Sequence, residues 1–275
     1  MSDRYGFEFI RSELEGRILT LTLNRPERRN AMHRAMHDEL APLFAKVAAD
    51  RDADVVILSA AGDKAFCPGA DFSGMQQNLA GGGYADGHPD LFLGSTSIVR
   101  NQLAVPQPIV AALNGDALGI GASLALFCDV VLMAEHARIG DPHVKAGLVS
   151  GDGGAILWPL LMGVNRAKEY LMTGDMLGAQ EAWRLGLVNH VYPAERLAAE
   201  ARALAERLAA GPRIAIQFNK RLANAELLDR VNRLLDASLA MEAVTFESAD
   251  HQEAVRAFLE KRAPVFGRAR EEAPV

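Results

Sequence analysis

Apolar residues in the first half of the chain alternate between strand-like and helix-like patterns. Residues 17–23 and 55–60 are short runs rich in leucine, isoleucine and valine, which favours β-strands, whereas residues 31–50 carry apolar side chains at helical spacing. Two further apolar runs, 109–113 and 129–134, flank a segment punctuated by glycines, which indicates buried strands joined through a short helix. The alternation predicts a layered α/β fold.

From residue 166 onward the pattern is mainly helical. One predicted helix has an apolar face made of Leu197, Ala201, Leu204 and Leu208. Residues 221–262 supply further helices, and residues 75–94 have no steady periodicity, so we interpret them as a mobile loop that could act as a lid. We therefore divide the chain into a core, residues 1–195, and a C-terminal helical region, residues 196–275.

Composition and charge exclude several classes of function. The 275 residues are 49% hydrophobic with a formal net charge of -6, so the chain has a sizeable core and no basic surface to attract nucleic acid or an anionic membrane. The start of the chain lacks the basic and apolar regions of a signal peptide, and no apolar run is long enough to span a membrane. Cys67 and Cys128 lie in apolar runs typical of buried thiols. We expect a cytoplasmic protein.

Two glycine-rich turns, residues 66–75 and 114–123, each follow a predicted strand. Glycine lets the backbone approach a ligand closely, and the first amides of a helix point along its positive end. Each turn can therefore offer an N–H group to an oxyanion. Strand-to-helix punctuation is the other interpretation, and spacing alone leaves both open.

Three segments, Leu23–Ala31 (LNRPERRNA), Phe66–Asp71 (FCPGAD) and Asn114–Gly121 (NGDALGIG), resemble in order and separation the signatures of the crotonase (enoyl-CoA hydratase/isomerase) superfamily. Similarity continues downstream to Phe258–Arg262. The resemblance implies a spiral of repeated β-β-α units and a C-terminal helical region that packs into trimers, often paired as hexamers. It also implies a CoA thioester substrate and no further cofactor.

The resemblance assigns binding roles to particular residues. The amides of Ala70 and Ile120 match the oxyanion hole. Four residues match positions along the CoA nucleotide and pantetheine arm: Pro68, Asp71, Phe72 and Ser73. Arg25 and Arg28 are candidate phosphate partners, although arginines just before a helix are commonly surface residues. Phe258 and Lys261 match positions that approach CoA, and Phe258 also suits a core position.

The chain departs from an ordinary hydratase at the glutamate pair that handles protons. The first glutamate position holds Ser123 and the second holds His143. Serine has no useful pKa as a base, whereas an unperturbed histidine titrates near 6.5 and can accept a proton at neutral pH. We therefore expect His143 to replace the glutamates as the catalytic base.

Two carboxylates are candidate partners of His143. Asp152 could orient and charge-stabilise the imidazole, or it could cap the helix that follows. This arrangement resembles a divergent crotonase branch, the β-diketone hydrolases of the 6-oxocamphor type, which cleave a carbon–carbon bond by a retro-Claisen reaction. In that branch a third acidic residue, in the C-terminal helices, assists the reaction, and Glu242 matches its position. The alternative interpretation of Glu242 is a solvated glutamate on the surface of a helix.

Three functions stay open. His143 and Asp152 could hydrate or isomerise an unusual enoyl-CoA, or they could direct water onto a β-diketone or β-ketoacyl-CoA. The third is a CoA-binding protein without catalysis.

Other polar residues are weaker candidates for a metal or substrate site. His33 and His37 are four residues apart on a predicted helix and could share a metal, but no third ligand is evident nearby, so we interpret them as a solvated face and predict no metal. Tyr84 and His88 could touch substrate from the loop, although an exposed loop tip is the simpler interpretation.

Overall fold

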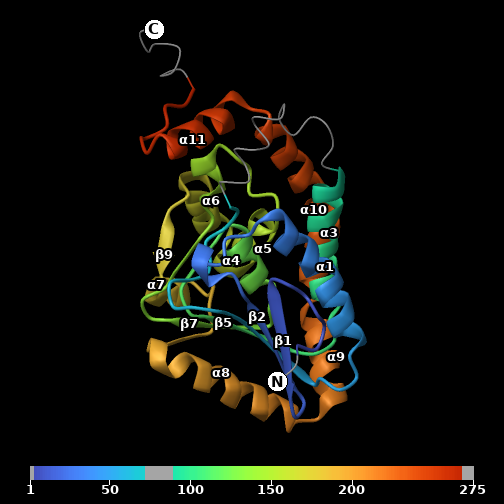
Figure 1. The fold of residues 1–275 in the computed structure, drawn as a ribbon. Helices are drawn as coiled ribbons and strands as arrows, with labels where there is room; N and C mark the ends of the chain where they lie inside the picture. The colour runs from blue at the N-terminus through green and yellow to red at the C-terminus, as the bar shows by residue number, and fades with distance from the viewer. Residues whose placement is uncertain (1–2, 72–88, 268–275) are drawn as a thin grey trace.

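The computed structural model describes residues 3–71 and 89–267 (Figure 1). Its larger sheet has six strands. Their order is β1 (Ile10–Glu15), β2 (Ile18–Leu23), β3 (Val55–Ala60), β5 (Ile109–Leu113), β7 (Val130–Ala134) and β10 (His190–Tyr192). β1 runs antiparallel to β2, and every other pair is parallel. Parallel neighbours require crossover connections, so the chain must leave this sheet and return between strands.

The smaller sheet receives the chain during these crossovers. It contains β4 (Ala65–Cys67), β6 (Asp116–Leu118), β8 (Arg138–Gly140) and β9 (Met176–Gly178), in that order. β3 is followed by β4, β5 by β6 and β7 by β8, so each turn of the chain contributes one strand to each sheet. The predicted α/β spiral of β-β-α units is confirmed.

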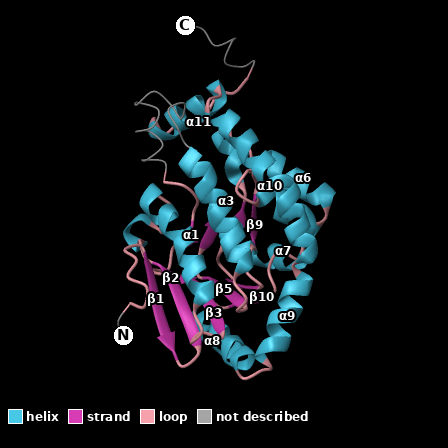
Figure 2. Cartoon of the chain, turned by 90° about the vertical axis from the view of Figure 1, so that its right-hand side faces the viewer, coloured by secondary structure: helices cyan, strands magenta, loops and turns pink. Residues whose placement is uncertain are grey.

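Helices surround the two sheets. The core contributes α1 (Arg34–Ala49), α3 (Pro89–Ala104), α4 (Ile120–Leu126), α5 (Gly154–Met162), α6 (Val164–Thr173) and α7 (Ala179–Arg184), and two short 3-10 helices, η1 (Pro26–Arg28) and η2 (Pro142–Ala146). The C-terminal part contributes α8 (Ala194–Ala209), α9 (Arg213–Ala223), α10 (Ala225–Phe246) and α11 (Ala249–Leu259). α1 and α3 lie side by side, and α8 packs beneath the large sheet against β3, β5 and β7 (Figures 1 and 2). Among the described residues, no helix is both long and apolar enough to cross a bilayer.

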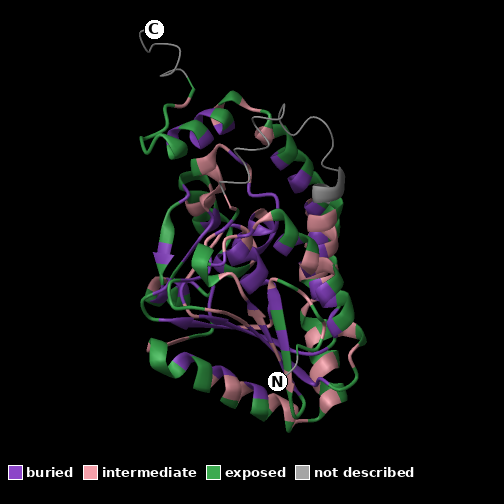
Figure 3. Cartoon of the chain, in the orientation of Figure 1, coloured by how far each residue is buried: buried purple, intermediate pink, exposed green. Residues whose placement is uncertain are grey.

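The hydrophobic core is formed by the strands of the large sheet, by α4 and α5, and by the inward faces of α1 and α8. Buried positions gather in the middle of the molecule (Figure 3). β5 is buried along its whole length, as expected for a central parallel strand covered on both faces. β1 is an edge strand, so buried and exposed positions alternate along it. Because its exposed positions are polar, the pattern of apolar residues did not predict this strand. The strands expected at 55–60, 109–113 and 129–134 are present, as is the short helix between the last two.

The interpretation of residues 75–94 as a loop is wrong for their last part. α3 begins at Pro89, and proline is favoured in the first turn of a helix because its missing N–H would have no partner there. Residues 75–88, with Tyr84 and His88, lie outside the described residues. The sequence pattern missed α3 because its apolar residues follow the glycine-rich stretch without a clear break.

The C-terminal helices are fastened to the core by buried polar contacts. Lys220 on α9 pairs with Asp129 at 2.7 Å, and both side chains are largely buried. On α10, the Ser238 hydroxyl donates to the Gly151 carbonyl at 2.8 Å. The second contact holds α10 against the loop that precedes α5, which is where the candidate site lies.

Candidate active site

The two glycine-rich turns lie together at one end of the strands of the small sheet. β4 and β6 are parallel neighbours, so their C-terminal ends lie at the same end of that sheet. Gly69 and Gly119 adopt positive φ angles of 102° and 53°, a region that favours glycine. A Cβ atom on Gly121 would lie 2.2 Å from the Cys67 carbonyl oxygen, so only glycine lets α4 start this close to β4.

Ala70 and Ile120, the predicted oxyanion-hole residues, each have a backbone N–H group at this end of the small sheet. Met32 donates to the Gly69 carbonyl at 2.8 Å and accepts from the Asp71 amide at 2.9 Å, so the amide of Ala70, between them, points away from Met32. Ile120 is the first residue of α4, and the N–H groups of a first helical turn have no acceptor within the helix. Both amides therefore suit an external oxyanion, and their catalytic role stays a prediction.

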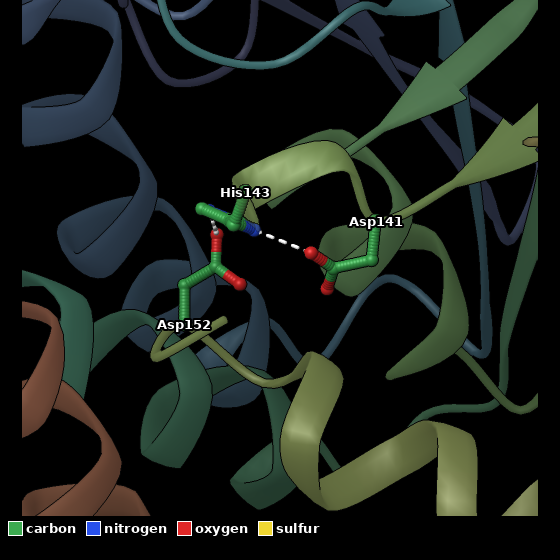
Figure 4. A group of neighbouring side chains, drawn as sticks. All are labelled: Asp141, His143 and Asp152. Carbon is green, nitrogen blue, oxygen red and sulfur yellow. Dashed lines mark hydrogen bonds and ion pairs between the residues drawn. The ribbon is translucent and has the colours of Figure 1, made fainter. Parts of the chain in front are cut away.

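His143 lies on η2, with Asp141 and Asp152 beside its ring (Figure 4) and a third carboxylate, that of Glu242, nearby. Its Nδ1 atom is 2.5 Å from Oδ1 of Asp141, a hydrogen bond. On the other side of the ring, Nε2 is 3.6 Å from Oδ2 of Asp152 and 3.7 Å from Oε1 of Glu242. These two distances are too long for hydrogen bonds. Nε2 is therefore the ring atom left to exchange a proton with a substrate or water.

Asp141 is the site residue that the sequence interpretation missed. The orienting hydrogen bond expected from Asp152 comes instead from Asp141, which is two residues before His143 and 1% exposed. The signal was present in the sequence, since Asp141 belongs to the same Gly-Asp-Pro-His motif. The resemblance to the β-diketone hydrolases favoured Asp152 instead.

Asp152 is held by Ser123 and does not cap α5. The Ser123 hydroxyl donates to Oδ1 of Asp152 at 2.9 Å, and both side chains are buried. The N-cap of α5 is Gly153, without a side-chain cap. Ser123 therefore fixes one oxygen of a carboxylate that the loop before α5 supplies.

Glu242 reaches the cluster from α10, so the C-terminal region contributes to the site. Its side chain is buried, which excludes the solvated helix glutamate considered above. A Cβ on Gly151 would lie 2.3 Å from Oε2 of Glu242, so glycine makes room for this carboxylate.

Burial and mutual charge shift the acid–base properties of all four groups. Burial alone lowers the pKa of His143, but the charges of Asp141, Asp152 and Glu242 outweigh burial and raise it well above its ordinary value. Burial favours protonation of Asp141, yet the charge and hydrogen bond of His143 hold its pKa low. Burial raises the pKa of Asp152, and it raises that of Glu242 to about 8.

This environment favours the protonated form of His143, because the carboxylates that face the imidazole raise its pKa well above that of an unperturbed histidine. The proton-transfer roles of His143, Asp152 and Glu242 stay predictions.

An apolar pocket adjoins the cluster. It is bounded by α3, α4 and the loop before α5, through Ser95, Ile98, Val99, Gln102, Ile120, Ser123, Leu124, Phe127 and Asp152. Ile120 and Asp152 both line it, so a ligand in this pocket would contact a predicted oxyanion-hole residue and the candidate acid–base group together.

The predicted CoA-binding residues in the described part of the chain are not among those that pair with His143 or line the apolar pocket. Arg25 contacts Asp71 at 2.7 Å and the Ala31 carbonyl at 3.0 Å, so it holds the turn after β4 in place. Arg28 is exposed and Pro68 is half-buried. Two other predictions, Phe72 and Ser73, lie outside the described residues. The CoA roles of all these residues stay predictions.

Phe258 and Lys261 lie at the end of α11 and just beyond it. Phe258 is 57% exposed, which argues against a core position in the single chain. Neither residue is among those that border His143 or line the apolar pocket in the described part of the chain.

The interpretation of His33 and His37 as a solvated face is wrong for His37. Its side chain is buried, and its Nε2 atom is 3.1 Å from the Ser95 hydroxyl. His33 packs edge-on against Phe9. Among the described residues, the side chains close enough to share a metal are Asp141, His143 and Asp152, whose donor atoms lie within 4.8 Å of one another. The absence of a metal in the working protein stays a prediction.

Comparison with known proteins identifies the family of this chain. Residues 13–269 match the family model of enoyl-CoA hydratase/isomerase. The chain is 34% identical to crotonyl-CoA hydratase of Syntrophomonas wolfei, covering 94% of this chain and 97% of that protein. It is 35% identical to 1,2-epoxyphenylacetyl-CoA isomerase of Escherichia coli, covering 94% and 98%. An enoyl-CoA hydratase/isomerase structure from Mycobacterium paratuberculosis superposes with a TM-score of 0.86 at 36% identity, covering 92% of this chain and 99% of that one.

Fold, turns and sequence define an acyl-CoA enzyme of the crotonase superfamily. The chain belongs to the enoyl-CoA hydratase/isomerase family.

Proposed function

We propose that this enzyme adds or removes a proton beside the carbonyl of an acyl-CoA thioester, as an enoyl-CoA hydratase or isomerase does, with His143, Asp152 and Glu242 replacing the glutamate pair. The observation that carries the proposal is that Nε2 of His143 faces both carboxylates at 3.6 and 3.7 Å, next to the pocket lined by Ile120 and Asp152. Relatives named as a hydratase and an isomerase support the same class.

In hydration, the thioester oxygen lies between the amides of Ala70 and Ile120. Asp152, fixed by Ser123, takes a proton from water while the water oxygen bonds to the β-carbon. The electron pair of the carbon–carbon double bond moves toward the thioester oxygen and gives an enolate, whose negative oxygen accepts hydrogen bonds from the two N–H groups. Glu242 or His143 then donates a proton to the α-carbon. Isomerisation needs no added water: a proton is removed from the α-carbon to give a dienolate held by the same two amides, and a proton is added at the γ-carbon.

Retro-Claisen hydrolysis of a β-diketone or β-ketoacyl-CoA is a second candidate. Ser123 favours it, because its hydroxyl is committed to Asp152 and α4 supplies no carboxylate of its own at this position. In this reaction water adds to one carbonyl, the carbon–carbon bond breaks, and the leaving enolate occupies the same pair of amides before it is protonated.

Product analysis in oxygen-18 water distinguishes the candidates. The enzyme is incubated with a panel of enoyl-CoA thioesters, cyclic β-diketones and β-ketoacyl-CoA thioesters. Mass spectrometry then determines which products carry oxygen-18. We expect label in a 3-hydroxyacyl-CoA. Label in a new carboxylate would support cleavage instead, and no turnover in any set would support a CoA-binding protein without catalysis.

We also propose that the enzyme works as a homotrimer or a dimer of trimers. α9 carries Ile214, Phe218 and Leu222 four residues apart, and they are 67%, 61% and 74% exposed in the single chain. Large apolar side chains repeated on one helix face are typical of an interaction surface. Sedimentation equilibrium should give a mass of three or six chains; a monomer mass would contradict this proposal.

A further inference from the structure

The Nδ1 side of His143 is closed by two buried residues that have no room to touch a substrate. Asp141 accepts from Nδ1 of His143 through Oδ1 and from the Ser150 hydroxyl through Oδ2, so both of its oxygens are occupied by protein groups. Asp141 is 1% exposed and Ser150 is 9% exposed. The apolar pocket is lined by Asp152, on the opposite, Nε2 side of the ring.

The backbone around Asp141 is packed too tightly for this arrangement to shift. A Cβ atom on Gly154 would lie 1.8 Å from Oδ2 of Asp141 and 2.1 Å from the Ser150 hydroxyl oxygen. Gly154 is also the first residue of α5, so the positive end of that helix lies against the Asp141 carboxylate and stabilises its charge. Near His143, the Leu148 amide donates to the His143 carbonyl at 2.9 Å. This hydrogen bond fixes the backbone between η2 and Ser150.

The three carboxylates around His143 therefore differ in what they are free to do. Asp141 is fixed by two hydrogen bonds on the far side of the ring. Asp152 has one oxygen held by Ser123 and the other facing Nε2. Glu242 faces Nε2 without a hydrogen bond to it. A division of labour follows from this geometry.

We propose that Asp141, held by Ser150, is the positioning residue of the site: it fixes the His143 ring so that Nε2 faces the substrate, and it leaves Asp152 and Glu242 free to exchange protons. This inference rests on the proposed acid–base function of His143. Its mechanism is that of an orienting carboxylate behind a histidine, which sets the tautomer and stabilises the charged ring without itself taking the proton.

The charge balance supports this assignment. The groups that face His143 are Asp141 from the end of β8, Asp152 from the loop before α5, and Glu242 from α10. Asp141 stays ionised because its pKa is held low by His143, whereas burial raises the pKa of Asp152 and Glu242. Asp141 is thus the carboxylate whose negative charge is most constant, and it contributes most to keeping the ring protonated.

The test compares Asp141→Asn with wild type by two independent measurements. Nuclear magnetic resonance of labelled histidine rings gives the pKa of His143, which is assigned from the spectrum of a His143→Gln sample. Hydration of crotonyl-CoA gives kcat and KM as a function of pH. Asp175→Asn is the matched control, because it makes the same change at an exposed carboxylate that pairs with Lys145.

Asp141→Asn should lower the pKa of His143 by roughly 1 to 3 units, because the closest opposite charge is lost. Above the lowered pKa, each unit of pH removes about nine-tenths of the protonated ring, so the alkaline limb of the kcat profile should move to lower pH by the same amount, with KM changing far less. Ser150→Ala should shift both quantities in the same direction by less. Asp175→Asn should match wild type.

A purely structural role for Asp141 predicts a different pattern. In that case Asp141→Asn would lower the melting temperature while the His143 pKa and the pH profile of kcat stayed as in wild type, and the proposal would be overturned. If wild type does not hydrate crotonyl-CoA, the proposed function loses its support for this substrate. The resonance titration then still decides whether Asp141 sets the charge of His143.

Discussion

Replacing His143 by glutamine should reduce kcat by roughly 10²- to 10⁴-fold, the usual contribution of a positioned acid–base group. Glutamine keeps similar bulk beside Asp141 but cannot carry a transferable proton. The predicted CoA-binding residues do not include His143, so KM should change much less than kcat. Steady-state kinetics on the preferred acyl-CoA of the panel measures both.

The control for this substitution is His136→Gln, which changes an exposed histidine just after β7. It should retain full activity. Circular dichroism of both variants checks folding, because loss of His143 leaves the buried charge of Asp141 without its cationic partner and should lower stability. A folded His143→Gln enzyme with the wild-type kcat would show that the histidine is not the proton carrier.

Ile120→Pro should lower kcat by roughly 10²- to 10³-fold, which corresponds to about 2.7 to 4 kcal/mol of transition-state stabilisation. The substitution removes one backbone N–H donor of the predicted oxyanion hole. Proline is tolerated at this position because Ile120 is the first residue of α4, where the lost N–H has no helical acceptor. Gly119, which precedes it, has the backbone freedom that a residue before proline needs.

Ile120→Val separates the amide from the side chain. Ile120 also lines the apolar pocket, so a change of side chain alone can alter substrate binding. Valine keeps the N–H and most of the apolar contact, so its kcat should stay within a few-fold of wild type. Equal losses in the proline and valine variants would mean that the amide does not stabilise the transition state.

The sequence predicted the fold well wherever burial is strong. β3, β5 and β7 have continuous apolar runs because both of their faces are covered, and the pattern located all three. β1 was missed because an edge strand exposes polar side chains at alternate positions. The start of α3 was missed because helical periodicity begins only after a glycine-rich stretch that has none.

The candidate site was predictable as a set of residues but not as a set of contacts. Family positions indicated His143, Asp152 and Glu242, and the structure brings all three together. The partner of Nδ1 could not be derived, because Asp141 and Asp152 are both plausible neighbours by spacing and only the path of the loop between them decides. The raised pKa of His143 has the same origin, since it depends on three carboxylates converging from separate elements.

Deuterium exchange at the α-carbon of an acyl-CoA in heavy water tests the central claim most directly. An enzyme that stabilises a thioester enolate between two amides and moves protons through His143, Asp152 and Glu242 should incorporate solvent deuterium at this carbon. Wild type should exchange far faster than the thioester alone, and both His143→Gln and Ile120→Pro should lose most of that rate. Exchange by wild type at the uncatalysed rate, across thioesters shown to bind, would contradict the account.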